Sequence, residues 1–246
     1  MSGHSKWANI KRKKGKMMPC ALKITTKISK EITIAARMGG GDPIGNMRLK
    51  LALQKAKENN IPKDNIQRAV QKGVGAAGGA GFDEVTYEGY GPGGAAVIAE
   101  CNTDNRNRAA AAVRHAFSHH GGSLGESGCV GWMFKKKGIL VVDRETVDED
   151  AIMMLALDSG AEDVKADEVC FLKIITAPGR FFYGPGSIRE NGISTTASEI
   201  SMIPDTTVAL AGDAASTMQN LIDELEELDD VQEVYTNADL PDEDEE

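Results

Sequence analysis

A glycine-rich segment, GVGAAGGAG at residues 73–81, divides the sequence into two parts of opposite charge. Up to Lys72 the chain holds 17 lysines and arginines against 4 acidic residues, whereas the rest holds 11 basic against 33 acidic residues. The formal net charge of -9 therefore conceals a basic head and an acidic body. Because such a field concentrates a polyanion at one end of the molecule and repels it at the other, the division constrains both the fold and the partners.

The chain of 246 residues has 41% hydrophobic residues, which is enough for normal cores in two or three small domains. No run approaches the roughly 18 apolar residues of a membrane span, and the basic amino terminus lacks the apolar block of a signal peptide. We therefore expect a cytoplasmic protein that does not enter a membrane. The cysteines form no C-x-x-C pair and are interpreted as reduced core residues. They are Cys20, Cys101, Cys129 and Cys170.

The basic head has the hydrophobic spacing of three helices. The first helix buries one face and turns a row of basic residues the other way. Its apolar positions are Ile24, Ile28, Ile32 and Ala35. GGGDP at 39–43 ends this helix, and Leu49 and Ala52 mark a second one. Pro62 suits the first turn of a third helix, which Gly73 closes.

From Phe82 onward short strands and helices alternate, which predicts the α+β class, with small sheets covered by helices on one face. The expected strands are 84–90, 95–101, 129–134, 138–143, 170–177, 196–204, 206–210 and 231–236. The expected helices are 105–119, 148–157 and 213–228. The acidic tail at 241–246 is expected to be disordered.

The strongest signal for a ligand is the basic arm, GHSKWANIKRKKGK at residues 3–16. Its cations can neutralise several phosphates, and Trp7 and His4 offer flat faces on which an unpaired base can stack. The alternative is a solvated basic terminus in which Trp7 only packs against the helical head. Duplex DNA and an RNA surface both carry the phosphates that this charge can bind. No helix-turn-helix spacing or zinc-finger pattern favours DNA.

The predicted contacts therefore fall on the arm and on the basic side of the first helix. The predicted nucleic-acid-binding residues are Lys6, Trp7, Lys11, Arg12, Lys13, Lys14, Lys16, Lys23, Lys27, Lys30 and Arg37. Secondary anion contacts are expected at Arg106, Arg108 and Arg114, which can equally pair with the acidic body. The oligomeric state has no signature in the sequence.

No catalytic, metal or cofactor site is predicted. The glycines of YEGYGPGG at 87–94 follow no phosphate-binding pattern and suit a tight turn. His115, His119 and His120 lack a partnering cysteine or acid nearby in the sequence, so they are interpreted as a helix end meeting its dipole. An enzyme that uses the glycine turn with Arg106 and Arg108 on a phosphorylated small molecule is the weaker alternative.

Several blocks of the sequence together resemble the YebC/PmpR family, which includes the mitochondrial translational activator of cytochrome oxidase. They are GHSKWANIKRKKG, EITIAARMGGGDP, ENNIPKDNIQRAV, YEGYGPGG, CNTDNRNR, VRHAFSHHGGSLGE and SMIP, and they cover nearly the whole chain in order. The resemblance implies a helical domain at 1–80, an α+β domain at 81–133 with 206–240, and an inserted α+β domain at 134–205.

The resemblance also implies function. The family is described as cytoplasmic DNA-binding transcriptional regulators and as ribosome-associated factors that help translation through difficult stretches, and it is not known as catalytic. Carried onto this chain, the nucleic-acid contacts fall on the basic head. Two stretches depart from the family pattern, MMPCAL at 17–22 and GRFFYGPG at 179–186. Because both resume the pattern without a change of length, we interpret them as paired compensating frameshifts.

Overall fold

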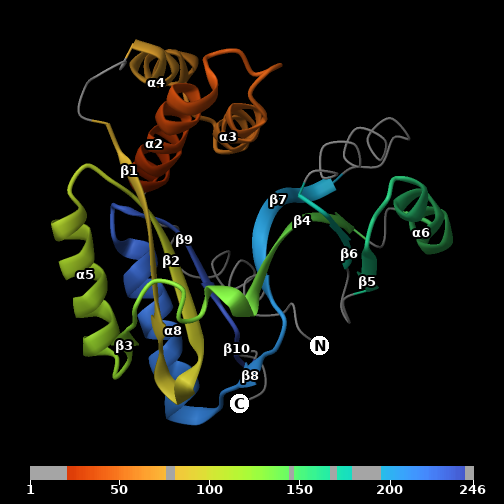
Figure 1. The fold of residues 1–246 in the computed structure, drawn as a ribbon. Helices are drawn as coiled ribbons and strands as arrows, with labels where there is room; N and C mark the ends of the chain where they lie inside the picture. Colours follow the sequence, from red (N-terminus) through yellow and green to blue (C-terminus); the bar gives the residue numbers. More distant parts are fainter. Residues whose placement is uncertain (1–20, 76–80, 144–146, 167–170, 179–194, 242–246) are drawn as a thin grey trace. The chain divides into compact units, whose positions relative to one another are not determined.

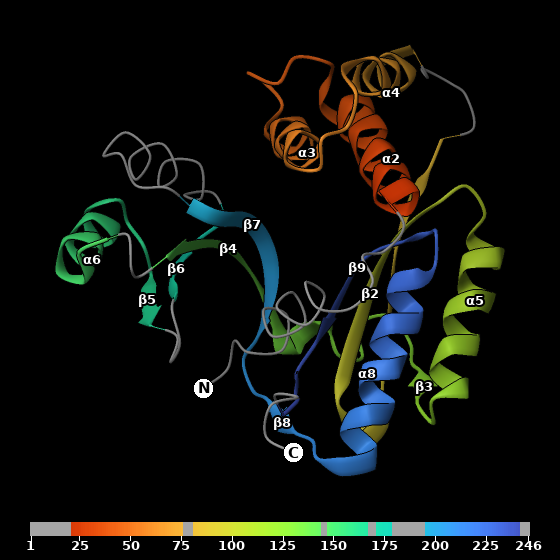
Figure 2. The same ribbon diagram turned by 180° about the vertical axis from the view of Figure 1, so that it is seen from behind.

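The computed structural model describes residues 21–75, 81–143, 147–166, 171–178 and 195–241, and Figures 1 and 2 show its fold. The chain splits into two compact units, Met1–Met133 with Thr206–Glu246 and Phe134–Asp205. The described residues hold six α-helices and several small sheets, which confirms the α+β class. The division into three domains stays a prediction. The basic arm, Cys20, Cys170, the stretch 179–186 and nearly all of the acidic tail lie outside the described residues.

Three helices form the helical head of the first unit, as the sequence predicts. They are α2 (Ala21–Gly39), α3 (Met47–Glu58) and α4 (Lys63–Gly75). Their shared core contains Ile32, Ala35, Ala36, Leu49, Ala52, Ala56, Ile61 and Ala69. A Cβ added to Gly73 of α4 would lie 2.4 Å from the carbonyl oxygen of Thr33 on α2. Glycine is therefore needed for these two helices to approach so closely.

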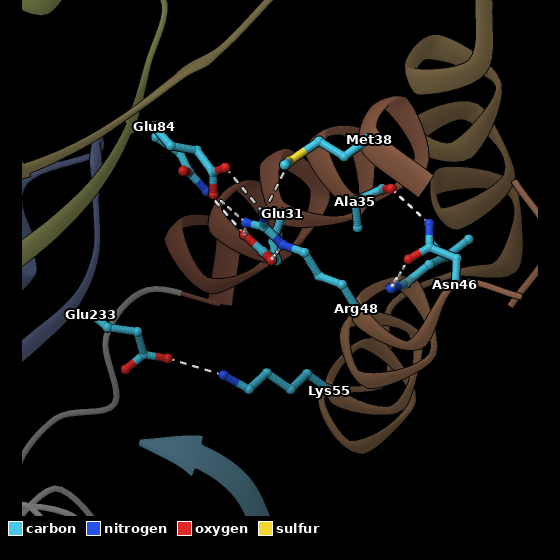
Figure 3. Close-up of polar contacts among 10 residues, drawn as sticks. Glu31, Ala35, Met38, Asn46, Arg48, Lys55, Glu84 and Glu233 are labelled. Carbon is cyan, nitrogen blue, oxygen red and sulfur yellow. Dashed lines mark hydrogen bonds and ion pairs between the residues drawn. The ribbon is translucent and has the colours of Figure 1, made fainter. Parts of the chain in front are cut away.

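Asn46 fixes the turn between α2 and α3 (Figure 3). Its side-chain oxygen accepts a hydrogen bond from the N–H of Leu49 at 3.1 Å and caps the first turn of α3. Its Nδ2 donates to the carbonyls of Ala35 at 2.7 Å and Gly40 at 2.8 Å, at the end of α2. One buried side chain therefore holds the end of one helix against the start of the next.

A four-stranded antiparallel sheet covered by two helices forms most of the rest of the first unit. Its strands are, in order, β3 (Ser123–Leu124), β1 (Asp83–Tyr90), β2 (Ala96–Thr103) and β9 (Val231–Thr236). Figure 2 shows α5 (Arg106–His119) and α8 (Gly212–Glu227) side by side against this sheet. Val97, Ala99 and Cys101 of β2 share a buried core with Phe117 of α5 and Met218 of α8. Burial raises the pKa of the Cys101 thiol to about 12, so it stays protonated, as expected for a core cysteine.

The second unit contains another four-stranded antiparallel sheet. Its strands are, in order, β5 (Asp163–Ala166), β6 (Phe171–Thr176), β4 (Phe134–Asp143) and β7 (Thr195–Pro204). The helix α6 (Glu149–Asp158) starts at Asp148, whose carboxylate accepts from the N–H of Asp150 at 3.0 Å. Leu140 of β4, Ile152 of α6 and Ile174 of β6 are all buried.

The sequence prediction is wrong for the strand at 129–134. A 3₁₀ turn, η2, occupies Gly131–Met133, and β4 begins only at Phe134. The cause is the buried carboxylate of Glu88 on β1, which binds the backbone of this segment. It accepts from the N–H groups of Gly128 at 2.9 Å, Val130 at 2.9 Å and Gly131 at 2.6 Å. N–H groups bound to a side chain are not available for a sheet ladder, so the chain turns here.

The prediction is also too long for the strand at 206–210. The strand β8 covers only Val208–Ala209, where it pairs in parallel with a short strand that the sequence pattern did not indicate, β10 (Ala238–Asp239). A two-residue strand has no period that sequence reading can detect.

We expect Glu88→Gln to lower the free energy of unfolding by about 1–3 kcal/mol at neutral pH, because an amide cannot accept all three N–H groups and turns a donor toward them. Burial raises the pKa of Glu88, but its backbone hydrogen bonds outweigh burial and hold this pKa below its ordinary value. A carboxyl pKa lowered by folding adds stability above the unfolded-state pKa and loses it as the pH falls through the folded-state pKa. The difference between wild type and variant should therefore shrink in acid.

Urea unfolding at neutral and acidic pH measures this difference. Glu126→Gln is the matched control, because it removes the same charge from an exposed position in the adjacent loop. An equal loss of stability in both variants would contradict the assigned role of Glu88.

Candidate nucleic-acid interface

Lys23, Lys27 and Lys30, which the sequence predicts to contact nucleic acid, donate to backbone carbonyls at the carboxyl end of α8. The contacts are Lys23 Nζ to Glu227 O at 3.4 Å, Lys27 Nζ to Glu226 O at 2.7 Å and Lys30 Nζ to Asp229 O at 2.8 Å. The last carbonyls of a helix lack helical partners and carry the negative end of its dipole. The row of lysines on α2 therefore complements the end of α8.

Asp230 follows α8 and connects three parts of the first unit. Its carboxylate accepts from Lys30 Nζ at 3.0 Å and from Arg108 Nη2 at 2.7 Å, and it is only 8% exposed. Burial raises the pKa of Asp230, but the hydrogen bonds from Arg108 and Lys30 outweigh it and lower the pKa below its ordinary value. The carboxylate is therefore held ionised between a cation of α2 and a cation of α5.

A second polar cluster surrounds Arg48 of α3 (Figure 3). Its Nε donates to Glu31 Oε1 at 2.7 Å and its Nη2 to Glu31 Oε2 at 3.1 Å, while Nη1 donates to Glu84 Oε2 of β1 at 3.1 Å. Asn102 of β2 adds a hydrogen bond to Glu31 at 3.0 Å. Burial lowers the pKa of Arg48, but its bonds to both carboxylates outweigh burial and raise it, so the guanidinium stays charged. Its planar fork matches two carboxylates at once.

Arg37 and two lysines surround Phe82 at the start of the sheet. Arg37 Nη2 donates to the carbonyl of Phe82 at 2.5 Å. The Nζ atoms of Lys30 and Lys72 lie 5.5 and 5.4 Å from the centre of the Phe82 ring, within the range of a cation–π contact. These cations of the head therefore also contact the protein itself.

The three arginines of α5 differ in their contacts. Arg106 Nε donates to Asp83 at 2.9 Å, and Arg108 Nη2 donates to Asp104 at 2.7 Å as well as to Asp230. Both arginines therefore form ion pairs with residues of the acidic body. Arg114 is exposed, and within the described part of the chain it has no hydrogen-bond or ion-pair partner.

Three exposed lysines of the head lack a hydrogen-bond, ion-pair or cation–π partner among the described residues. They are Lys50 and Lys57 of α3 and Lys63 of α4. Lys50 and Lys57 are seven residues apart and therefore lie on one helical face. The sequence prediction does not include these lysines. The local sequence does not distinguish them, because Lys23 and Lys30, which contact the end of α8, likewise have no acidic residue three or four positions away.

Residues 5–76 match the family model described as the TACO1/YebC protein N-terminal domain, and residues 82–238 match the one described as the TACO1/YebC second and third domain. This chain belongs to the TACO1/YebC family. The resemblance seen in the sequence is confirmed across both parts of the chain.

The relatives support the same conclusion over nearly the full length. A protein of Pelotomaculum thermopropionicum is 54% identical over 98% of this chain and 100% of its own. A protein of Desulforamulus reducens is 55% identical over 96% of this chain and 98% of its own. Both are named probable transcriptional regulatory protein, which places this TACO1/YebC chain among regulators.

A crystal structure extends the comparison to the fold. A conserved hypothetical protein from Aquifex aeolicus is 41% identical, with a TM-score of 0.86 over 98% of this chain and 100% of that chain. In the residues that the structure describes, no helix has both the length and the hydropathy to cross a bilayer.

We expect Asp230→Asn to lower the free energy of unfolding by about 1–3 kcal/mol at neutral pH, because Lys30 and Arg108 lose a charged acceptor. The folded-state pKa of Asp230 is lowered, so its contribution is present above the unfolded-state pKa and is lost as the pH falls through the folded-state pKa. Wild type and variant should converge in acid. Chemical denaturation at several pH values tests this, with Asp229→Asn as control because the side chain of Asp229 is exposed. Equal effects of the two substitutions would contradict it.

Proposed function

We propose that this TACO1/YebC protein is a non-catalytic regulator that controls transcription by binding DNA. The observation that carries the proposal is the division of the basic residues of the head into two sets. The first set contacts carboxylates, carbonyls or Phe82 within the protein. The second set, Lys50, Lys57 and Lys63, is exposed with no such contact inside the described residues. Exposed lysines are available to phosphates, and their binding releases counterions.

The basic arm supplies the main phosphate contacts in this proposal. Its residues are Lys6, Trp7, Lys11, Arg12, Lys13, Lys14 and Lys16. Lys50, Lys57 and Lys63 extend the phosphate-binding surface along the helical head. In this proposal Lys23, Lys27, Lys30 and Arg37 contribute less to phosphate binding, because their cations already contact the protein. Arg114 remains the candidate for a secondary anion contact.

Two observations support a protein without catalytic activity. Arg106 and Arg108 pair with acidic residues, which leaves them poorly placed to bind a phosphorylated small molecule. The glycines at 93 and 94 adopt positive φ angles of 68° and 75° in a tight turn, η1 (Pro92–Gly94), between β1 and β2. Phosphate loops instead place such glycines between a strand and a helix. The same proposal includes a cytoplasmic location. In bacteria, such as the organisms that hold its relatives, DNA is directly accessible in the cytoplasm.

A ribosome-associated translation factor is the second candidate. The observation that favours it is Trp7 among the cations of the arm, because a tryptophan can stack on an unpaired base. Ribosomal RNA and tRNA offer unpaired bases, whereas duplex DNA keeps its bases stacked and paired. Phosphate contacts alone do not separate the two candidates, since both nucleic acids provide them.

We expect that changing Lys11, Arg12, Lys13 and Lys14 together to Ala will abolish most nucleic-acid binding in cells. Removing about four phosphate contacts should also reduce the slope of log K against log salt by about 3–4, because each contact contributes about 0.9. Crosslinking followed by sequencing of the bound nucleic acid measures the first effect, and a salt titration on purified protein measures the second.

The matched control changes four lysines of the second unit, Lys135, Lys136, Lys137 and Lys165, to Ala. Promoter DNA lost only in the arm variant supports the transcriptional regulator. Ribosomal RNA or tRNA lost only in the arm variant supports the translation factor and overturns DNA as the target. Equal crosslinking of wild type and arm variant would overturn both, provided that circular dichroism shows the variants to be folded.

A further inference from the structure

Three histidines converge on one carboxylate where the end of α5 meets α8. His120 Nε2 lies 2.7 Å from Glu224 Oε2, and His119 Nδ1 lies 3.1 Å from the same oxygen. His115 Nδ1 lies 3.5 Å from the other carboxylate oxygen, Glu224 Oε1. No local sequence pattern joins these residues, because Glu224 follows the histidines by more than a hundred positions.

Rigid elements hold this cluster in place. His119 is the last residue of α5 and His120 is its C-cap, whose N–H donates to the carbonyl of Ala116 at 3.3 Å. Just inside the cluster, Phe117 of α5 and Leu221 and Leu225 of α8 are buried in the same core. Because both helices are anchored by this packing, the imidazoles and the carboxylate need little rearrangement to act together.

The donor atoms have the chemistry and spacing of a transition-metal site. His119 Nδ1, His120 Nε2 and an oxygen of Glu224 all lie within 4.8 Å of one another. Zinc is bound by histidine nitrogen and carboxylate oxygen at about 2.0–2.2 Å, so its ligands in a tetrahedral site lie roughly 3.4 Å apart. Calcium and magnesium prefer oxygen ligands alone, so this donor set selects against them.

The exposure of the cluster leaves room for an ion to enter. The side chain of His120 is 14% exposed, that of Glu224 30%, and that of His119 62%. The buried side of the site is thus formed by His120 and Glu224, and the open side by His119 and solvent. Water or the nearby His115 can complete the coordination.

We propose that His119, His120 and Glu224 form a binding site for a divalent transition-metal ion, with zinc as the ion that this donor set fits. The ion crosslinks the carboxyl end of α5 to α8 on the face of the sheet that they cover. It therefore binds the folded unit and not the unfolded chain, and it raises stability by mass action. This proposal is independent of nucleic-acid binding by the head, so either can fail without the other.

The test is a titration of the full-length protein with Zn²⁺ against a chromogenic chelator, with thermal unfolding measured with and without the ion. We expect one Zn²⁺ per chain at this site and an unfolding temperature that rises with Zn²⁺ and returns when a chelator removes it. His120→Ala and Glu224→Gln should each weaken this binding at least tenfold, the lower end of the roughly 10–100-fold loss seen even for outer-shell partners. Both should also remove the rise in unfolding temperature.

Glu227→Gln is the matched control, because it removes the same charge from an exposed position one turn further along α8. Binding of Co²⁺ gives a second readout, since its visible spectrum reports nitrogen and oxygen ligands directly and should disappear in Glu224→Gln. No Zn²⁺ binding by wild type would overturn the proposal. So would equal affinity of wild type, His120→Ala and Glu224→Gln, which would assign the ion to other residues such as cysteines.

Discussion

The first unit depends most on the ion pairs of one ionised carboxylate, that of Asp230. It is buried, it follows α8 directly, and it accepts hydrogen bonds from Lys30 of α2 and Arg108 of α5. A buried charge without partners is strongly unfavourable, so each of these cations is needed to keep the carboxylate ionised. The helical head, the helix α5 and the end of α8 therefore meet at a single negative charge.

These contacts change what the distribution of charge along the sequence implies for phosphate binding. The basic head carries far more positive than negative charge, but the carboxyl end of α8, Asp230 and Glu84 engage many of its cations inside the protein. An engaged cation contributes little to non-specific phosphate binding, because its present contact must first be lost. The acidic body therefore reduces how many cations of the head can bind a polyanion at once, and it leaves Lys50, Lys57 and Lys63 exposed.

Local patterns predicted most of the helices and the longer strands. The spacing of Ile28, Ile32 and Ala35 marks α2, because the helical period repeats within a few residues. The turn at 131–133 was missed because Glu88, more than forty positions away, binds its backbone. Such a contact has no local signature, so it becomes visible only once β1 and η2 lie together.

The candidate sites also depend on contacts between residues that are far apart in the sequence. Sequence alone identifies which residues carry positive charge, but the contacts of Lys23, Lys27 and Lys30 with residues about 200 positions later depend on the closed fold. The histidine cluster has the same origin, because only the packing of α5 against α8 brings Glu224 to His119 and His120. Residue type therefore predicts which contacts a side chain can make, whereas the fold decides whether those contacts are already made within the chain. Among the described residues of the head, Lys50, Lys57 and Lys63 are exposed and make no such contact within the chain.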